Sequence, residues 1–226
     1  MGAGGHLPQT WDGLAELAAP HGLWPIGGFH TDAEDDVPRG TETLVLLAPR
    51  DVVFWPVFTA SPEYGDGAPH PLDRWSRRVI GRLACGLGAK ALFPFSGPPW
   101  RPFIAWALRT ESIHSSPVGL LVEAEAGLFV SLRGALALKE RIALPVSRAS
   151  PCESCAAQPC RTACPVSALT VDGYATETCR SYLETSAGAD CVERGCAVRR
   201  ACPASQTWPR PPVQSAFHMR AFHGSS

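Results

Sequence analysis

Eight of the nine cysteines lie within about fifty residues of one another, in the last third of this 226-residue chain. Two of them, Cys164 and Cys202, are followed directly by proline, and each closes a group of cysteines. The spacing runs C-x2-C-x4-C-x3-C-P and later C-x11-C-x4-C-x5-C-P. So many closely spaced thiols indicate metal–sulfur chemistry or a disulfide framework. The eight are Cys152, Cys155, Cys160, Cys164, Cys179, Cys191, Cys196 and Cys202.

The cysteine pattern resembles that of bacterial two-cluster ferredoxins. In those proteins three closely spaced thiolates hold one 4Fe–4S cube, and the thiolate of the Cys-Pro pair ligates the other cube. The usual run is C-x2-C-x2-C-x3-C-P, so the second gap of this chain is two residues longer. The resemblance implies crossed ligation and two ligand sets. One cluster is assigned to Cys152, Cys155, Cys160 and Cys202, and the second to Cys164, Cys179, Cys191 and Cys196.

Zinc and disulfides are the alternatives to two cubes. Four cysteines can close a tetrahedral zinc site, but zinc ribbons favour two paired C-x2-C knuckles and need no proline after the last ligand. One cube together with zinc, or with a degraded second site, is a further alternative. Disulfides fit least well, because nothing else in the chain indicates export.

Length and charge restrict the compartment and the partners. The chain has room for one domain of about 150 residues and a small appendage. Residues 1–28 show no basic segment followed by an apolar run, and no window reaches the length that spans a bilayer. We therefore expect a cytoplasmic protein without a membrane partner. The formal charge is −1, and two oxidised cubes with four thiolates each would add about −4, which argues against nucleic acid as a partner.

Arginines are frequent among the cysteines. Their charges could offset the cluster charge and raise the reduction potentials, or they could form an ordinary solvated face. The residues concerned are Arg161, Arg180, Arg194, Arg199 and Arg200.

The first seventy residues alternate short apolar runs with polar, turn-rich segments. In order, we expect a helix over residues 10–19 with Thr10 as N-cap, an edge strand over 23–29, a surface loop over 31–40, a buried central strand over 43–48, a helix over 51–59 and a loop over 61–69.

The clearest helix is predicted to begin at Pro71. Leu72, Trp75 and Val79 recur at spacings of three and four residues, while arginines occupy other faces. Cys85 lies on this helix, and we expect it to be a buried, unreactive thiol.

Further strands and helices complete the N-terminal part. Mixed elements of this length predict an α+β layered domain, which we place at residues 1–145, with a linker at 145–151 and the cysteine domain at 151–226. The expected elements are a strand over 91–95, a helix over 101–112, and two strands over 118–123 and 128–138 joined by a tight turn at 124–127.

The N-terminal domain carries no self-sufficient catalytic motif, since G-x-G-x-x-G, P-loop, H-E-x-x-H and G-x-S-x-G patterns are all missing from the sequence. The aromatic residues near Trp100 are most simply core residues. Residues 112–116 join a helix to a strand, where pocket loops often lie. The candidate cofactor contacts are Trp100, Trp106, His114 and Ser116.

Several segments resemble the epoxyqueuosine reductases, which are cobalamin-dependent iron–sulfur enzymes. Leu144-Pro145 followed by the cysteine run, and the segment Cys179-Arg-Ser-Tyr-Leu-Glu-Thr, are similar to theirs. The run GLLVEAEAGLFVSLRGALAL, residues 119–138, also resembles paired strands of the cblC-type cobalamin-processing protein. Where epoxyqueuosine reductases have V-D-S-A-P with a catalytic aspartate, this chain has P-F-S-G-P at residues 94–98, so no catalytic residue is assigned.

The resemblance implies a nitroreductase-like mixed sheet with flanking helices, followed by a small ferredoxin-like domain. It also implies an iron–sulfur oxidoreductase in which two 4Fe–4S clusters pass single electrons to a corrinoid (cobalamin), or to a flavin, in the N-terminal domain. The expected reductant is a flavodoxin or a ferredoxin reductase. The alternatives are an electron carrier without chemistry of its own and a divergent epoxyqueuosine-reductase-like enzyme.

Overall fold

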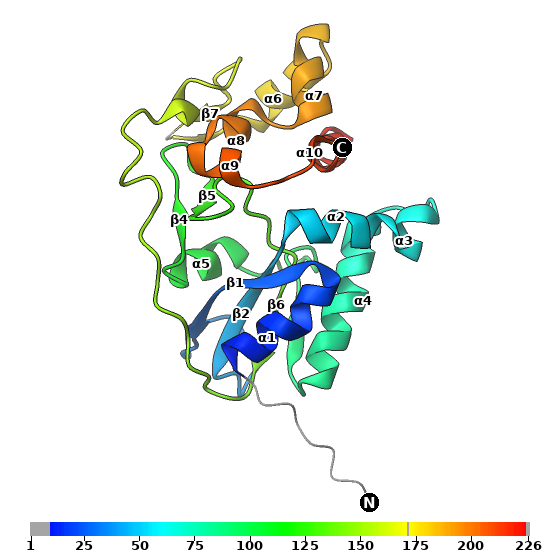
Figure 1. Ribbon diagram of the computed structural model, residues 1–226, viewed down its shortest axis with the longest axis vertical. Helices are drawn as coiled ribbons and strands as arrows, with labels where there is room; N and C mark the ends of the chain where they lie inside the picture. The colour runs from blue at the N-terminus through cyan, green and yellow to red at the C-terminus, as the bar shows by residue number, and fades with distance from the viewer. Residues whose placement is uncertain (1–9, 171, 225–226) are drawn as a thin grey trace, which may run out of the picture. The chain divides into compact units, whose positions relative to one another are not determined.

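The computed structural model describes residues 10–170 and 172–224, which form two compact units. Unit 1 contains residues up to 111 and residues 131–147, and unit 2 contains residues 112–130 and those from 148 onward. Figure 1 labels the elements of both units. Within the described ranges no helix has the length and apolarity needed to cross a membrane. Residues 1–9, the start of the segment without a signal-peptide pattern, lie outside the described ranges.

Unit 1 is built on a four-stranded antiparallel sheet in the order β1-β2-β6-β3. The expected central strand is confirmed, because every residue of β2 is buried, and β1 is the expected edge strand. The register shifts between Pro25 and Gly27 of β1, where a proline without an N–H interrupts the ladder. The strands are β1 (Leu23–His30), β2 (Thr43–Pro49), β3 (Lys90–Leu92) and β6 (Gly134–Leu138).

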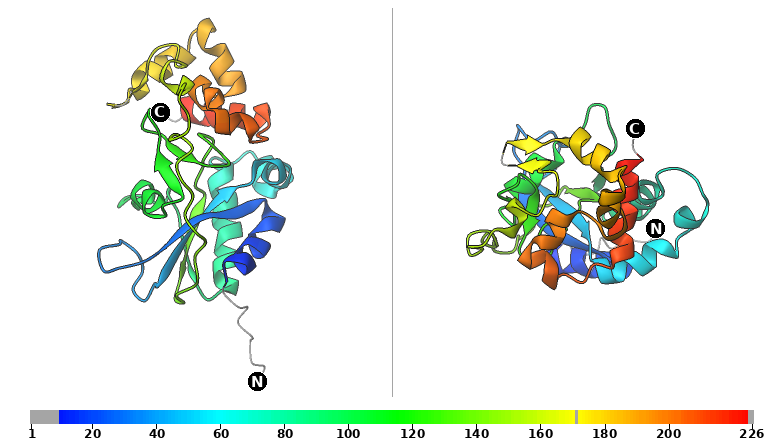
Figure 2. Two further views of the ribbon diagram at one scale, coloured as in Figure 1. Left: turned by 60° about the vertical axis from the view of Figure 1, so that its left-hand side comes forward. Right: turned by 90° about the horizontal axis from the view of Figure 1, so that it is seen from above.

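Helices cover both faces of this sheet, as the left view of Figure 2 shows. On one face Gly28 lies against Trp11 of α1 (Trp11–Ala18). On the other face a Cβ at Gly27 would lie 2.7 Å from the side chain of Thr110, which ends α5 (Phe103–Arg109). Adjacent glycines thus let α1 and α5 approach the same strand from opposite sides.

Most helices of unit 1 follow the sequence pattern, but a short helix, α3, lies in the segment 61–69 that was expected to be a loop. Thr10 is the N-cap of α1, since its hydroxyl accepts a hydrogen bond from the Gly13 N–H at 3.1 Å. Phe54, Phe58 and Trp75 are fully buried and pack edge to face or stacked, which fixes α2 against α4. The remaining helices are η1 (Ala19–His21), α2 (Asp51–Thr59), α3 (Pro62–Gly65) and α4 (Pro71–Gly86).

The prediction that Cys85 is buried is wrong, because Cys85 is exposed to solvent. Cys85 lies three residues after Arg82 and seven after Arg78, so all three share the polar face of α4. The buried stripe instead ends at Ala84.

The predicted hairpin over residues 118–138 is also wrong. β5 (Leu121–Glu123) pairs with β4 (Ile113–Ser115) in unit 2, whereas β6 pairs with β2 and β3 in unit 1. Between them the chain crosses from one unit to the other. Arg133, at the end of this crossing, is buried and paired with Asp73 of α4. The guanidinium therefore lies in the interior of unit 1, where the Asp73 carboxylate balances its charge.

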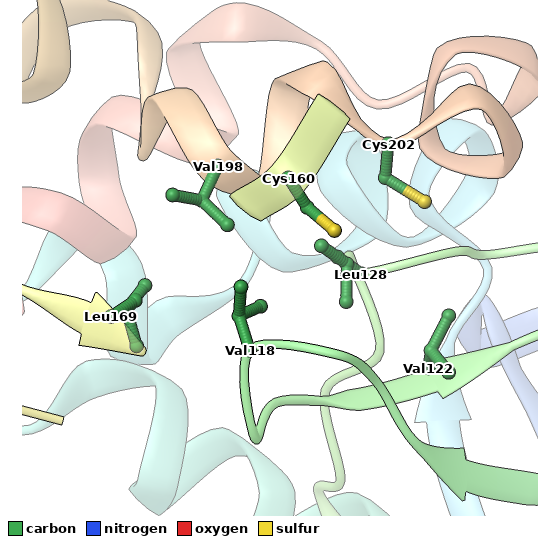
Figure 3. Close-up of a cluster of buried hydrophobic side chains, with 7 residues drawn as sticks. All are labelled: Val118, Val122, Leu128, Cys160, Leu169, Val198 and Cys202. Carbon is green, nitrogen blue, oxygen red and sulfur yellow. The ribbon is translucent and has the colours of Figure 1, made fainter. Parts of the chain in front are cut away.

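Unit 2 packs a β4–β5 hairpin under short helices and the cysteine loops. Seven buried residues, including Cys160 and Cys202, form its apolar core (Figure 3). Its further strands are β7 (Leu169–Thr170) and β8 (Gly173–Tyr174). Its helices are η2 (Pro159–Arg161), α6 (Thr176–Leu183), η3 (Ser186–Gly188), α7 (Ala189–Arg194), α8 (Ala197–Ala201), α9 (Pro203–Thr207) and α10 (Pro212–His223).

The fold is therefore α+β, with a small antiparallel sheet and flanking helices. Residues 112–130 belong to unit 2 because their backbone is held by its helices. Ser205 Oγ accepts a hydrogen bond from the Leu128 N–H at 2.8 Å, and Arg199 donates one to the Leu128 carbonyl. Gly127, at φ 56°, allows this approach, since a Cβ there would lie 2.3 Å from the Ser205 nitrogen.

Candidate metal centres

The eight clustered cysteines line two separate cavities, four to each. This division coincides with the two ligand sets implied by the ferredoxin resemblance. Cys202, forty-two positions after Cys160, lines the same cavity, while Cys164 lines the other. The first cavity is lined by Cys152, Cys155, Cys160 and Cys202, and the second by Cys164, Cys179, Cys191 and Cys196.

The first cavity is large, at about 510 Å³, and has no charged side chain in its lining. Cys160 and Cys202 are buried, and Leu128 lies beside them in the core (Figure 3). The longer gap between Cys155 and Cys160 forms part of the wall and turns at Gln158, whose φ is 38°. The two additional residues of the C-x4-C spacing are thus accommodated in a loop beside the cavity.

A polar side chain also faces this first cavity. Ser116 is 7% exposed, and within the described ranges its Oγ has no hydrogen-bond partner. A tight turn positions it, since the Gly119 N–H donates to the Ser116 carbonyl at 2.9 Å and the Ser116 N–H donates to the Leu120 carbonyl at 2.8 Å. A buried hydroxyl without a partner is costly, so this group is suited to donate to an acceptor inside the cavity.

The second cavity is narrow, at about 20 Å³, which is room for about one water molecule. Its wall is apolar apart from two tyrosines, Tyr174 of β8 and Tyr182 of α6. Four thiols converge on it from four short segments. A cluster of several atoms would require this cavity to widen.

In the described part of the chain, hydrogen bonds reach three sulfurs of the second set, including one from the Ala197 N–H to Cys191. The Ala168 N–H donates to Cys164 Sγ at 3.2 Å. Burial raises the pKa of the Tyr174 hydroxyl, and the hydrogen bond that this hydroxyl donates to Cys179 raises it further. Donors aimed at cysteine sulfur are among the means by which a protein stabilises a reduced iron–sulfur cluster.

Burial affects the pKa of thiols in both sets. Burial raises the pKa of Cys160, and the charges of Cys152, Cys202 and Cys155 raise it further. Burial likewise raises the pKa of Cys179, whose neighbouring thiols belong to the second set. Thiols gathered in this way become thiolates together only when cations balance them, so a metal bound at either cavity would release protons.

Most of the arginines expected near clusters have other partners, which favours the interpretation as a solvated face for them. Arg161 bonds Gln158, Arg180 pairs with Glu177, and Arg194 and Arg200 share Asp190.

Arg199 is the exception among the five. It is half-buried and donates to the Leu128 carbonyl, and it forms no ion pair with a carboxylate in the described part of the chain. Burial lowers the pKa of its guanidinium, and the Cys196 thiolate is the first of the groups that oppose this. A sequestered cation needs a negative partner, and the second cysteine set is the one at hand.

Three of the four candidate cofactor contacts do not line a cysteine cavity. Trp106 is 2% exposed and packs on Phe103 with ring centroids 4.9 Å apart, as a core residue does. Trp100 is 66% exposed in unit 1. His114 belongs to unit 2, where its Nε2 bonds the Arg148 carbonyl at 2.8 Å. Ser116 alone of the four lines a cysteine cavity.

The donor set fits iron–sulfur clusters in number and type, with four thiols for each of two sites. All nine cysteines, which lie within the described ranges, carry free thiols. Over residues 10–170 and 172–224 no three Cys, His, Asp or Glu side chains are arranged to hold a single metal ion. The volume of the first cavity is sufficient for a cube. The second cavity offers the four thiols that a cube needs, but its volume is too small for one unless the cavity widens.

Comparison with known proteins adds no relative to this picture. No family model, curated protein or solved structure matches the chain.

Proposed function

We propose that this chain is an iron–sulfur redox protein whose unit 2 holds two 4Fe–4S clusters. The observation that carries the proposal is the division of eight thiols into two cavities of four. Cys164 follows the first three cysteines in sequence but lines the cavity of the later ones, and Cys202 follows the later ones but lines the cavity of the first three. Such clusters accept and release one electron each. On this proposal unit 2 is ferredoxin-like, and unit 1, a sheet with helices on both faces, is nitroreductase-like.

The surrounding residues take defined roles in this proposal. Ser116 donates a hydrogen bond into the first cavity, and the Ala168 N–H and the Tyr174 hydroxyl donate to sulfur at the second. Arg199 supplies positive charge beside Cys196. Neither cavity has a charged residue in its lining, but the Arg199 guanidinium acts on Cys196 of the second set, so the two sites differ. We expect the second site to have the higher potential.

A stepwise anaerobic reduction tests this function. Because each 4Fe–4S cluster takes one electron, the protein should take up about two electrons per chain from dithionite or from a reduced flavodoxin. The two steps should be separable by potential, and the cluster absorbance should bleach in proportion to both. A protein that takes up no electrons would exclude the redox proposal, and uptake of a single electron would exclude a second cluster.

The acceptor is a separate proposal, a corrinoid bound by unit 1. Ile104 and Leu108, one turn apart on α5, and Trp100, three residues before the helix begins, are all exposed, so this segment carries an apolar strip. A strip of this kind can contact the broad face of a macrocycle, and an aromatic side chain is the usual anchor in such contacts. Trp106, one of the residues first considered, is in the core instead.

Titration of hydroxocobalamin into the anaerobic full-length protein tests the acceptor. We expect a saturable change in the corrinoid spectrum and faster formation of cob(II)alamin once the protein is reduced. Trp100→Ala should weaken binding by about tenfold, because truncating an anchor residue costs about 1–2 kcal/mol. Val146→Ala, at an apolar residue of unit 1 that is also exposed, should leave binding unchanged. An unaltered spectrum would remove the corrinoid and leave a two-cluster electron carrier.

A further inference from the structure

The first cysteine cavity is larger than a cluster requires. Its volume is about 510 Å³, whereas the second cavity, with the same number of thiols, measures about 20 Å³. A cube has eight atoms. If each atom takes about 30 Å³, the share of a water molecule in the liquid, the cube fills no more than about 240 Å³. About half of the first cavity would therefore stay open beside a bound cluster.

The wall of this first cavity is apolar and uncharged. Leu128 and four prolines line it, and among the residues that the structure describes no Asp, Glu, Lys or Arg does. Pro117 comes from the β4–β5 hairpin and Thr207 from the end of α9, so the lining extends beyond the cysteine loops. An ionised ligand would find no counter-charge in this wall, which favours a neutral and largely apolar molecule.

Three hydroxyl groups line the first cavity, and two of them already have acceptors. Ser154 donates to the Pro151 carbonyl at 3.4 Å, and Thr207 donates to the Ala204 carbonyl at 2.9 Å. Over residues 10–170 and 172–224 the Ser116 hydroxyl has no partner, although Ser116 is only 7% exposed. Because a buried hydroxyl without a partner costs free energy, this group is available to donate to an acceptor atom of a ligand.

We propose that the first cavity binds, beside its cluster, a neutral small molecule of the quinone class whose ring carbonyl accepts a hydrogen bond from Ser116. This inference rests on the two-cluster function proposed above. A quinone ring is uncharged and mostly hydrocarbon, which suits the apolar wall. Its carbonyl oxygen accepts hydrogen bonds but donates none, so it complements the free hydroxyl.

The number of electrons also suits a quinone. One quinone takes up two electrons, together with two protons from water, to become a hydroquinone, and two one-electron clusters carry that number. Cys160 and Cys202 of the first set belong to the apolar core of unit 2 (Figure 3), and Cys164 and Cys196 of the second set pack against the same core. Packed side chains thus connect the two sets. The quinone would be a second acceptor beside the corrinoid, because every residue that lines this cavity belongs to unit 2.

Equilibrium dialysis of duroquinone against the oxidised, anaerobically purified full-length protein tests the proposal. Every ring carbon of this probe that would add to a thiol carries a methyl group, so cysteine adducts are suppressed. We expect one saturable site per chain. Ser116→Ala should weaken binding by about three- to tenfold, as the loss of one neutral hydrogen bond does. Ser116→Thr keeps the hydroxyl and should bind within about twofold of the unaltered protein.

Two controls separate this role from a structural one. Ser116→Ala removes a buried hydroxyl without a partner in the described residues, so the protein should unfold at no lower temperature than before. Ser186→Ala changes an exposed serine of unit 2 that lines neither cysteine cavity, and it should bind duroquinone as the unaltered protein does.

Iron content, measured on each sample first, distinguishes the two possible failures. A well-folded protein that cannot be loaded with about eight iron atoms would contradict the two-cluster function, and the quinone site with it. If the protein holds about eight iron atoms but shows no saturable binding, the quinone site alone is overturned. Equal affinities of the unaltered protein and Ser116→Ala would likewise overturn it.

Discussion

Replacing Cys202 with alanine should remove the same cluster as replacing Cys160, although the two residues lie forty-two positions apart. Each single variant should retain about four iron atoms per folded chain, because a cube that lacks one of its four thiolates is lost. The double variant Cys160→Ala/Cys202→Ala should also retain about four. Cys160→Ala/Cys164→Ala should retain almost none, despite the closeness of these two residues in sequence.

These results are expected because Cys202 lines the same cavity as Cys160, whereas Cys164 lines the other cavity. Iron and sulfide are measured on monomeric protein whose circular dichroism shows that it is folded, because ligands and local fold are coupled. Cys85→Ala is the control, since Cys85 is exposed on α4 in unit 1, and it should leave the iron content unchanged. Retention of about four iron atoms by the Cys160/Cys164 double variant would mean that neighbouring cysteines share one site.

Arg199→Gln should lower the reduction potential of the second site by roughly 50–100 mV, the order of magnitude for removing one nearby charge at an effective dielectric constant of about 20. Reduction adds a negative charge beside Cys196, and the guanidinium is the cation that favours it. The measurement is a potentiometric titration followed by electron paramagnetic resonance. Iron content should stay at the unaltered level, because Arg199 is not a ligand in this proposal.

Arg199→Lys separates charge from packing. Lysine keeps the positive charge but loses the planar fork that donates to the Leu128 carbonyl, so the potential should recover most of the difference. Arg220→Gln removes an exposed charge and should shift neither potential, because solvent screens it. Equal shifts in Arg199→Gln and Arg199→Lys would show that Arg199 acts on the second site through packing alone.

Much of unit 1 can be predicted from local pattern. The run TLVLLA is long enough for a strand and apolar enough to be buried on both faces, and it forms the centre of the sheet. A threonine just before an apolar periodic segment is typical of an N-cap, and the Thr10 hydroxyl accepts a hydrogen bond from an N–H in the first turn of α1. The stripe of Leu72, Trp75 and Val79 is likewise buried. In each case the residues that determine the element are adjacent or within two turns.

The failures concern pairing over longer distances. Alternation in residues 118–138 indicates strands but does not name their partners, and β5 and β6 belong to different sheets. Arg133 would suit a solvated face by type, but Asp73, sixty positions earlier, compensates its charge in the interior. Spatial neighbours decide both of these cases. Cys85 differs, because the local spacing already puts it on the same face of α4 as Arg78 and Arg82, and that face is polar.

The cysteine sites lie between these extremes. Their grouping follows from the resemblance to two-cluster ferredoxins, and the two cavities divide the thiols in the same way. The donor from Tyr174 to Cys179 has no sequence signal of its own. Ser116 was expected to contact an N-terminal cofactor, yet it lines the first cysteine cavity, because the β4–β5 hairpin belongs to unit 2.

The central claim is that eight thiols hold two cubes, and elemental analysis tests it most directly. Protein made with adequate iron and purified without oxygen should contain about eight iron and about eight sulfide per chain, with zinc well below one. Both contents should fall together when the protein is exposed to air. About four iron atoms per chain, or stoichiometric zinc without sulfide, would contradict the two-cluster account.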